Sequence, residues 1–138
     1  MDGRSIVARA RKLVGTRFLP QGRDPSRGID CLGLAQISYA VSVNSVRDDY
    51  QLSGSANGDA LLAGLAPHFR RISRGAARPG DLMLLRPGRD QWHVAVLTEF
   101  GFVHADARRR AVIETPGDPE WPVAAYYRRR RINAKRGR

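Results

Sequence analysis

The first half of the chain carries its apolar residues at helical spacing. One stripe consists of Ile6, Val7, Ala10, Leu13 and Val14. This stripe predicts a first helix that Ser5 caps and Gly15 ends, because serine is a preferred N-cap and glycine is preferred just beyond a helix.

Two further helical patterns follow. The apolar run from Leu32 to Val41 predicts a helix that begins at Cys31, after an irregular loop over 16–28 that contains glycine and proline. A weaker pattern, carried by the leucines within Gly58–Phe69, predicts a third helical segment. Pro67 is expected to interrupt it, because proline has no N–H to donate.

The second half has the pattern of short strands. After the turn signal Arg78–Asp81, β-rich runs alternate with turn residues: Leu82–Leu85, Trp92–Thr98, Phe102–His104, Ala111–Glu114 and Val123–Arg128. Gly117–Pro122 fits either a loop near a functional cleft or a surface turn, and we favour the surface turn. Helices followed by strands are typical of an α+β domain. We therefore expect N-terminal helices packed on a small antiparallel β-sheet.

The length of the chain and its cysteine content limit the classes of protein to which it can belong. The 138 residues suffice for a single domain over 1–138, and no linker or repeat divides them. The single cysteine excludes an intramolecular disulfide, and one cysteine with three histidines argues against a structural zinc site. We expect no metal and no cofactor. Two roles remain for the cysteine, packing in the core or catalysis.

The N-terminal segment lacks the continuous apolar stretch of a signal peptide. No other stretch of the sequence is apolar over the length needed to cross a bilayer. These patterns predict a protein that is made in the cytoplasm without a signal peptide and is not inserted into a membrane.

The charge is strongly positive. Twenty-four Lys and Arg against thirteen Asp and Glu give a net charge of +11, which indicates polyanionic surroundings or an arginine-rich genome. We interpret Arg108–Arg110 as a solvated hairpin tip and Arg128–Arg131 as the start of a basic C-terminal tail over about 128–138. Nucleic acid is not the expected partner. That alternative rests on charge alone, because no zinc-finger, zipper or helix-turn-helix pattern accompanies it.

Cys31 is placed where a thiol can become a nucleophile. It follows Asp30, a competent N-cap, and the nearby Gly28 and Gly33 leave the backbone unencumbered. The N–H groups at a helix start stabilise a thiolate and lower the pKa of the thiol. A lone cysteine is more often a small buried apolar residue, so both roles stay open at this point.

Two histidines flank a predicted hairpin turn. His93 begins one strand and His104 ends the next. Residues paired across adjacent strands have Cβ atoms about 4.5–5.5 Å apart. The two imidazoles can therefore meet if the register puts them on one face.

Together these residues match the needs of nucleophilic acyl transfer. The reaction requires a nucleophile, a base, a group that orients the base, and donors for the oxyanion. We assign Cys31, His93 and His104 to the first three roles. The backbone N–H of Cys31 is a natural oxyanion donor.

Four motifs, in this order, resemble those of the NlpC-type cell-wall cysteine peptidases: Gly28–Gln36, Arg78–Leu82, His93–Leu97 and Gly101–Ala105. The resemblance spans roughly residues 5 to 115 and implies the papain-like NlpC-type fold. It also implies a thiol protease that hydrolyses peptidoglycan stem peptides, commonly between γ-D-glutamyl and diaminopimelate. The family's nucleophile, base and third polar residue map onto Cys31, His93 and His104.

Two positions depart from the family's pattern. Phe18 stands where a tyrosine is usual, and Leu32 replaces the serine of Asp-Cys-Ser-Gly. Two hydroxyl groups that help relatives to bind substrate are therefore absent. The resemblance places Phe18, Leu32 and Asp30 in the substrate-binding site, with Asp30 available to a free amine.

Asp-Cys-Leu-Gly, with Gly15-Thr16 ahead of it, resembles the branch found in phage tail operons and in phage-derived gene transfer agents. This implies a virion component with tail-tip proteins as partners, which opens the cell wall locally for DNA delivery. Two alternatives remain. One is a catalytically weak or inactive tail-tip protein of the same fold, and the other is a basic nucleic-acid-binding module.

Overall fold

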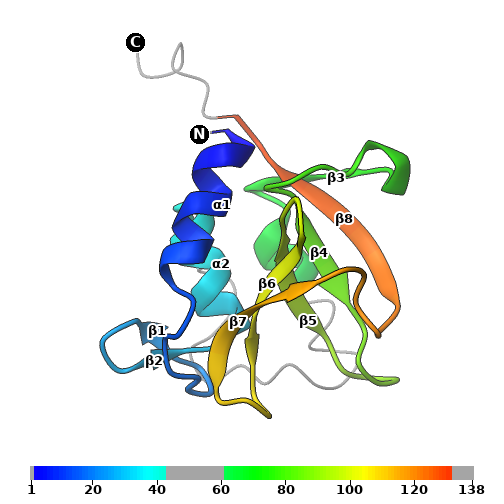
Figure 1. Ribbon diagram of the computed structural model, residues 1–138. Helices are drawn as coiled ribbons and strands as arrows, with labels where there is room; N and C mark the ends of the chain where they lie inside the picture. Colours follow the sequence, from blue (N-terminus) through cyan, green and yellow to red (C-terminus); the bar gives the residue numbers. More distant parts are fainter. Residues whose placement is uncertain (1, 43–60, 132–138) are drawn as a thin grey trace, which may run out of the picture.

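The computed structural model describes residues 2–42 and 61–131. Helices α1 (Gly3–Lys12) and α2 (Cys31–Tyr39) come first, and a short ribbon of β1 (Arg23–Asp24) and β2 (Gly28–Ile29) lies between them in the chain. The described second half forms a six-stranded antiparallel sheet and one 3-10 turn: β3 (Phe69–Ile72), η1 (Arg74–Ala76), β4 (Leu82–Leu85), β5 (His93–Leu97), β6 (Gly101–Asp106), β7 (Ala111–Pro116) and β8 (Val123–Arg129). The strand order is β3-β8-β4-β5-β6-β7, so β8, the last of the described strands, lies inside the sheet (Figure 1).

Helices α1 and α2 lie side by side on one face of this sheet (Figure 1). The main core fills the space between the helices and strands, and its members include Ile6, Leu34, Val94, Val96 and Val103. A smaller apolar cluster gathers Met83, Leu85, Ala95 and Phe102. Side chains alternate along a strand, so these residues point away from the valines. The predicted α+β arrangement is confirmed.

The start of α1 differs from the prediction. Asp2 is the N-cap, and its carboxylate accepts a hydrogen bond from the backbone N–H of Ser5 at 2.8 Å. Ser5 therefore lies inside the first turn instead of capping it. Val14 lies beyond the end of the helix and is 44% exposed, so it does not extend the buried stripe. None of the described helices is long and apolar enough to cross a membrane.

The helix at the cysteine agrees with the prediction. It begins at Cys31, with Asp30 as N-cap, and Tyr39 is its last residue. The third predicted helix is shorter than expected, because residues 61–65 are helical but Phe69 already begins β3. Residues 58–60 of that prediction lie outside the described residues.

The five predicted strands correspond to β4 through β8, with ends shifted by a few residues. The sequence did not predict β3. Its sequence, Phe-Arg-Arg-Ile, has two consecutive exposed arginines at its centre, so apolar and polar residues do not alternate.

The two arginine runs differ in structure. Residues 108–110 form the exposed turn between β6 and β7, as interpreted. In contrast, β8 extends through Arg129, so Arg128 and Arg129 belong to the sheet and not to a tail. Arg128 donates to the buried Asp81 at 2.8 Å, and this ion pair holds the end of β8 in place.

Candidate active site

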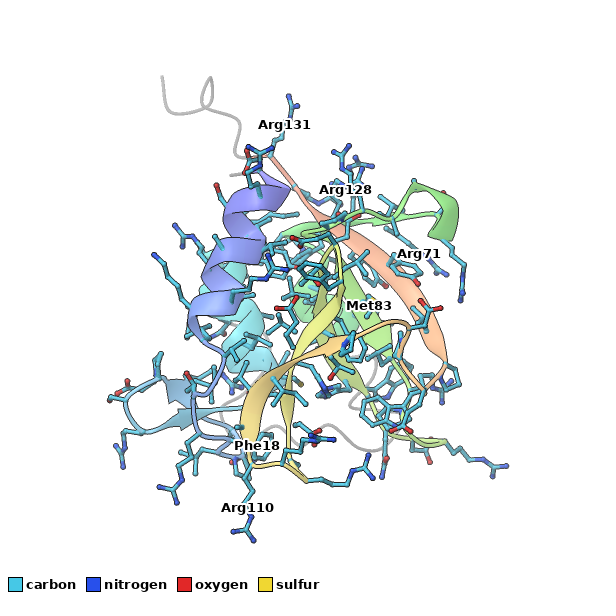
Figure 2. All side chains as sticks on the ribbon, viewed as in Figure 1. Phe18, Arg71, Met83, Arg110, Arg128 and Arg131 are labelled. Atoms are coloured by element: carbon cyan, nitrogen blue, oxygen red, sulfur yellow. The ribbon has the colours of Figure 1, made fainter. Side chains whose placement is uncertain are left out.

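Cys31, His93 and His104 line one cleft of about 590 Å³. It lies where α2 and β5 begin and β6 ends, and its walls include these aromatic and proline side chains: Phe18, Pro20, Pro87, Trp92 and Trp121. Figure 2 labels Phe18 at this end of the molecule. Within the described residues, no group of three or more His, Cys, Asp or Glu side chains is placed to hold a metal ion.

The carboxylate of Asp30 joins the start of α2 to the loop ahead of it. One oxygen accepts from the backbone N–H of Gly33 at 2.9 Å and from Arg23 Nη1 at 2.7 Å. The other accepts from the backbone N–H of Gln21 at 2.9 Å. A Cβ at Gly33 would strike the backbone oxygen of Gly22, so the glycine lets the loop pack directly on the helix. That Asp30 also binds a substrate amine stays a prediction.

Cys31 is 1% exposed, and it lies beside the backbone N–H of Val94, the neighbour of His93. Burial raises the pKa of the Cys31 thiol, and the negative charge of Asp30 raises it further. The backbone N–H groups of Val94 and Cys31 lower the pKa by less. The helix start therefore lowers this pKa as expected, but burial outweighs it. The expected net lowering was wrong, and Cys31 is a neutral thiol in the free protein.

The register of β5 and β6 brings the two histidines together. Leu97 pairs with Phe102, and alternation places His93 on the side of Leu97 and His104 on the side of Phe102. His93 Nε2 lies 3.1 Å from His104 Nδ1, within hydrogen-bond distance. The contact expected from side-chain alternation is present.

A third polar side chain completes this line. His104 Nε2 lies 3.3 Å from Thr115 Oγ1. On β7, Ile113 pairs with His104 and Thr115 pairs with Phe102, so Thr115 projects on the face that carries both histidines. The sequence assignment missed Thr115, because the predicted strand ended at Glu114 and the pairing of β6 with β7 is known only from the structure.

Trp121 covers the two imidazoles. Its ring centroid lies 5.6 Å from that of His93 and 6.0 Å from that of His104, with both pairs near edge-to-face. Of the two interpretations of Gly117–Pro122, the structure agrees with a loop near the cleft and not with the favoured surface turn, because this segment supplies one wall of the cleft. Nothing in the local sequence indicates that its tryptophan turns inward.

Both histidines are neutral in the folded protein. Burial lowers the pKa of His93 to about 3, with a smaller lowering from His104 and an opposing effect of Asp106. Burial also lowers the pKa of His104, and there Asp106 acts in the opposite direction. A neutral imidazole is the form that can accept a proton from a thiol.

The free energy of unfolding is expected to decrease as the pH falls from about 6.5 to about 4. His93 gains a proton in the unfolded chain over this range but stays neutral when folded, because burial lowers its pKa to about 3, and the lowered pKa of His104 acts in the same direction. A pKa lowered by folding contributes stability above the unfolded value, which is lost on acidification at about 1.4 kcal/mol per pH unit for each proton. Urea unfolding of the protein and of His93→Gln measures this. Equal pH slopes for the two proteins would contradict the expectation.

Phe18 and Leu32, the two other residues predicted for the substrate-binding site, lie in different surroundings. Phe18 is half-buried and lines the cleft, as the resemblance implied. Leu32 is 1% exposed, belongs to the main core and does not line the cleft. Its assignment to the substrate-binding site was wrong, because the second residue of α2 turns its side chain toward the core.

The fold was compared with known proteins. No protein-family model matches the chain, and no curated protein matches it. Among solved structures, the NlpC/p60 domain of the peptidoglycan hydrolase SagA matches with a TM-score of 0.57 and 24% identity, over 84% of this chain and 90% of that one. The P60 domain of antigen MAP1204 from M. avium subspecies paratuberculosis matches with a TM-score of 0.59 and 22% identity, over 92% and 93%.

A larger protein, NlpC1 from Trichomonas vaginalis, matches with a TM-score of 0.67 and 20% identity. The match covers 92% of this chain but only 44% of NlpC1, so the chain corresponds to less than half of that protein. The similarity extends over nearly the whole length of the SagA and MAP1204 domains. The chain has the papain-like α+β fold of the NlpC/p60 domains.

Proposed function

We propose that this protein is a cysteine peptidase that hydrolyses amide bonds in peptidoglycan stem peptides, with the γ-D-glutamyl–diaminopimelate bond as its target. One observation carries the proposal: a buried thiol at a helix start shares a cleft with two hydrogen-bonded neutral histidines. The fold gives further support, because SagA and RipB, both named as peptidoglycan hydrolases, are among its solved examples.

The proposed role of His93 as the base requires one protonation state of the two histidines. His93 can accept a proton at Nδ1 only if its own proton is on Nε2, which then donates to His104 Nδ1. His104 must in turn carry its proton on Nε2 and donate to Thr115 Oγ1. The reverse direction would leave His93 Nδ1 protonated and unable to act as a base. Thr115 is thus a positioning residue for both rings.

The chemical steps follow from this state. His93 Nδ1 takes the proton of Cys31 as the sulfur attacks the carbonyl carbon, because neither group is charged beforehand. The backbone N–H of Cys31 donates to the oxyanion. The protonated His93 then gives its proton to the leaving amine, which leaves a thioester on Cys31. Water, deprotonated by His93, hydrolyses the thioester and restores the thiol.

The setting that we propose is a phage-like tail or gene transfer agent, in which the protein opens the wall locally for DNA delivery. The support is the resemblance of Asp30–Gly33, together with Gly15-Thr16, to that branch. Mass spectrometry of purified particles tests this setting, since the chain should be found in them. If the chain is absent from the particles, the proposed phage-like setting is wrong, but the peptidase proposal is not affected.

Digestion of purified diaminopimelate-type peptidoglycan tests the activity. The protein should release stem-peptide fragments whose masses place the cut between γ-D-glutamyl and diaminopimelate. Cys31→Ala, prepared in parallel, should release none. The same fragments from both proteins would disprove the proposed nucleophile.

A null digestion result is resolved with a thiol-directed probe. If no fragments appear and the probe labels Cys31 equally fast in the unaltered protein and in His93→Gln, the protein keeps the fold without the activity. That outcome would favour the alternative of a structural tail-tip protein. Labelling that is faster in the unaltered protein than in His93→Gln would instead indicate a thiol that His93 activates, with another amide substrate.

A further inference from the structure

A second hollow, of about 890 Å³, lies away from the cleft. It is bounded by the start of α1, the beginning of β3, the turn before β4 and the end of β8, and six of its lining residues are arginines: Arg70, Arg78, Arg128, Arg129, Arg130 and Arg131. No described residue lines both cavities. Figure 2 shows Arg128 and Arg131 at one end of the molecule and Phe18 at the other.

Three of these arginines are held in place by the protein. Arg128 donates to Asp81 at 2.8 and 2.9 Å and to the backbone oxygen of Ala76. Arg129 Nε donates to the backbone oxygen of Tyr39, and Arg130 Nε donates to that of Ala66. A guanidinium has five N–H donors, so each of these fixed cations retains donors for a ligand.

The other three arginines make no side-chain hydrogen bond or ion pair with the described residues: Arg70, Arg78 and Arg131. The acidic residues of the lining are already engaged. Asp81 is paired with Arg128, and Asp2 caps α1. The lining therefore presents a net positive charge that the described protein does not neutralise.

We propose that this hollow binds a phosphodiester polyanion. The planar guanidinium matches the geometry of phosphate and binds it through paired hydrogen bonds. Six arginines along one hollow suit a ligand with several linked phosphates better than a single anion. Because Arg128, Arg129 and Arg130 are already ordered, less side-chain entropy is lost on binding.

Two triple variants with the same charge change test the hollow. One variant, which we call the groove triple because its three residues line the hollow, replaces Arg70, Arg78 and Arg131 by glutamine. The control triple replaces three exposed arginines that line neither cavity: Arg9, Arg27 and Arg110. Each lowers the net charge equally, so a difference in binding reports the position of the arginines and not the total charge.

Fluorescence anisotropy with a labelled short duplex DNA, over a series of salt concentrations, is the measurement. Each phosphate contact contributes about 0.9 to the slope of log K against log salt concentration. The groove triple should therefore lower the magnitude of this slope by about 2.7, whereas the control triple should leave it nearly unchanged. Equal losses in the two triples, or no binding by the unaltered protein at low salt, would overturn the proposal.

Two additional measurements complete the test. Inorganic polyphosphate is added as a competitor: displacement of the DNA identifies phosphate charge as the feature bound, and retention identifies nucleic acid, and either result supports the site. Urea unfolding checks that both triples fold. If the groove triple does not, Arg131→Gln alone should lower the slope by about 0.9, and an unchanged slope would overturn the proposal.

Discussion

Replacing Cys31 by serine is expected to lower kcat/KM for stem-peptide hydrolysis by about 10⁴-fold or more, the loss typical when a nucleophile is removed. A hydroxyl gives up its proton far less readily than a thiol, and His93 is a weak base because burial lowers its pKa to about 3. The variant keeps the buried volume nearly constant. Initial rates on a diaminopimelate-containing stem peptide measure the effect.

Ser38→Ala is the matched control for this prediction. Ser38 lies in the same helix, is fully buried and does not line the cleft. Its substitution should leave the rate nearly unchanged. Hydrolysis by Cys31→Ser at a rate close to that of the unaltered protein would contradict the proposed mechanism, provided that the urea midpoints of the three proteins agree.

Asp81→Asn is expected to lower the free energy of unfolding by about 3 kcal/mol, because it leaves a largely buried arginine without its counter-ion. Asp81 is 3% exposed and accepts from Arg128 and from the backbone N–H of Arg78. Only 19% of the Arg128 side chain is exposed. Urea unfolding at neutral pH is the measurement.

Glu120→Gln provides the comparison, because it breaks an ion pair that is exposed to solvent. Arg108 and Glu120 have side chains that are 79% and 69% exposed, so the loss should stay below about 1 kcal/mol. Similar small losses for Asp81→Asn and Glu120→Gln would show that the Arg128–Asp81 pair does not stabilise the end of β8.

Local sequence patterns were sufficient to predict most of the fold. The strands β4 through β8 were predicted because β-rich runs and turn residues alternate within a few positions of one another. The cap of α1 was assigned to the wrong residue because Asp2 and Ser5 are both good N-caps, and only the structure shows which accepts the bond. The edge strand β3 lacks an alternating pattern altogether.

Part of the candidate site was also predictable from the sequence. The alternation of side chains along two paired strands was enough to predict that His93 and His104 lie on one face, since one register fixes the face of every residue in a strand. Trp121 and the raised pKa of Cys31 were not predictable, because both depend on segments far apart in sequence that pack around the cleft. The local sequence gave the helix start but not its burial.

The position of β8 also has a consequence for how the chain folds. β8 is the last strand among the described residues, yet it lies between β3 and β4 and pairs with both. The sheet therefore closes only through contacts between distant parts of the sequence, which is a slow step in folding. Until β8 is in place, β3 has no partner strand in the described sheet and β4 exposes an unpaired edge, and such edges readily pair with other chains. A chain cut before Val123 should aggregate rather than form a smaller stable sheet.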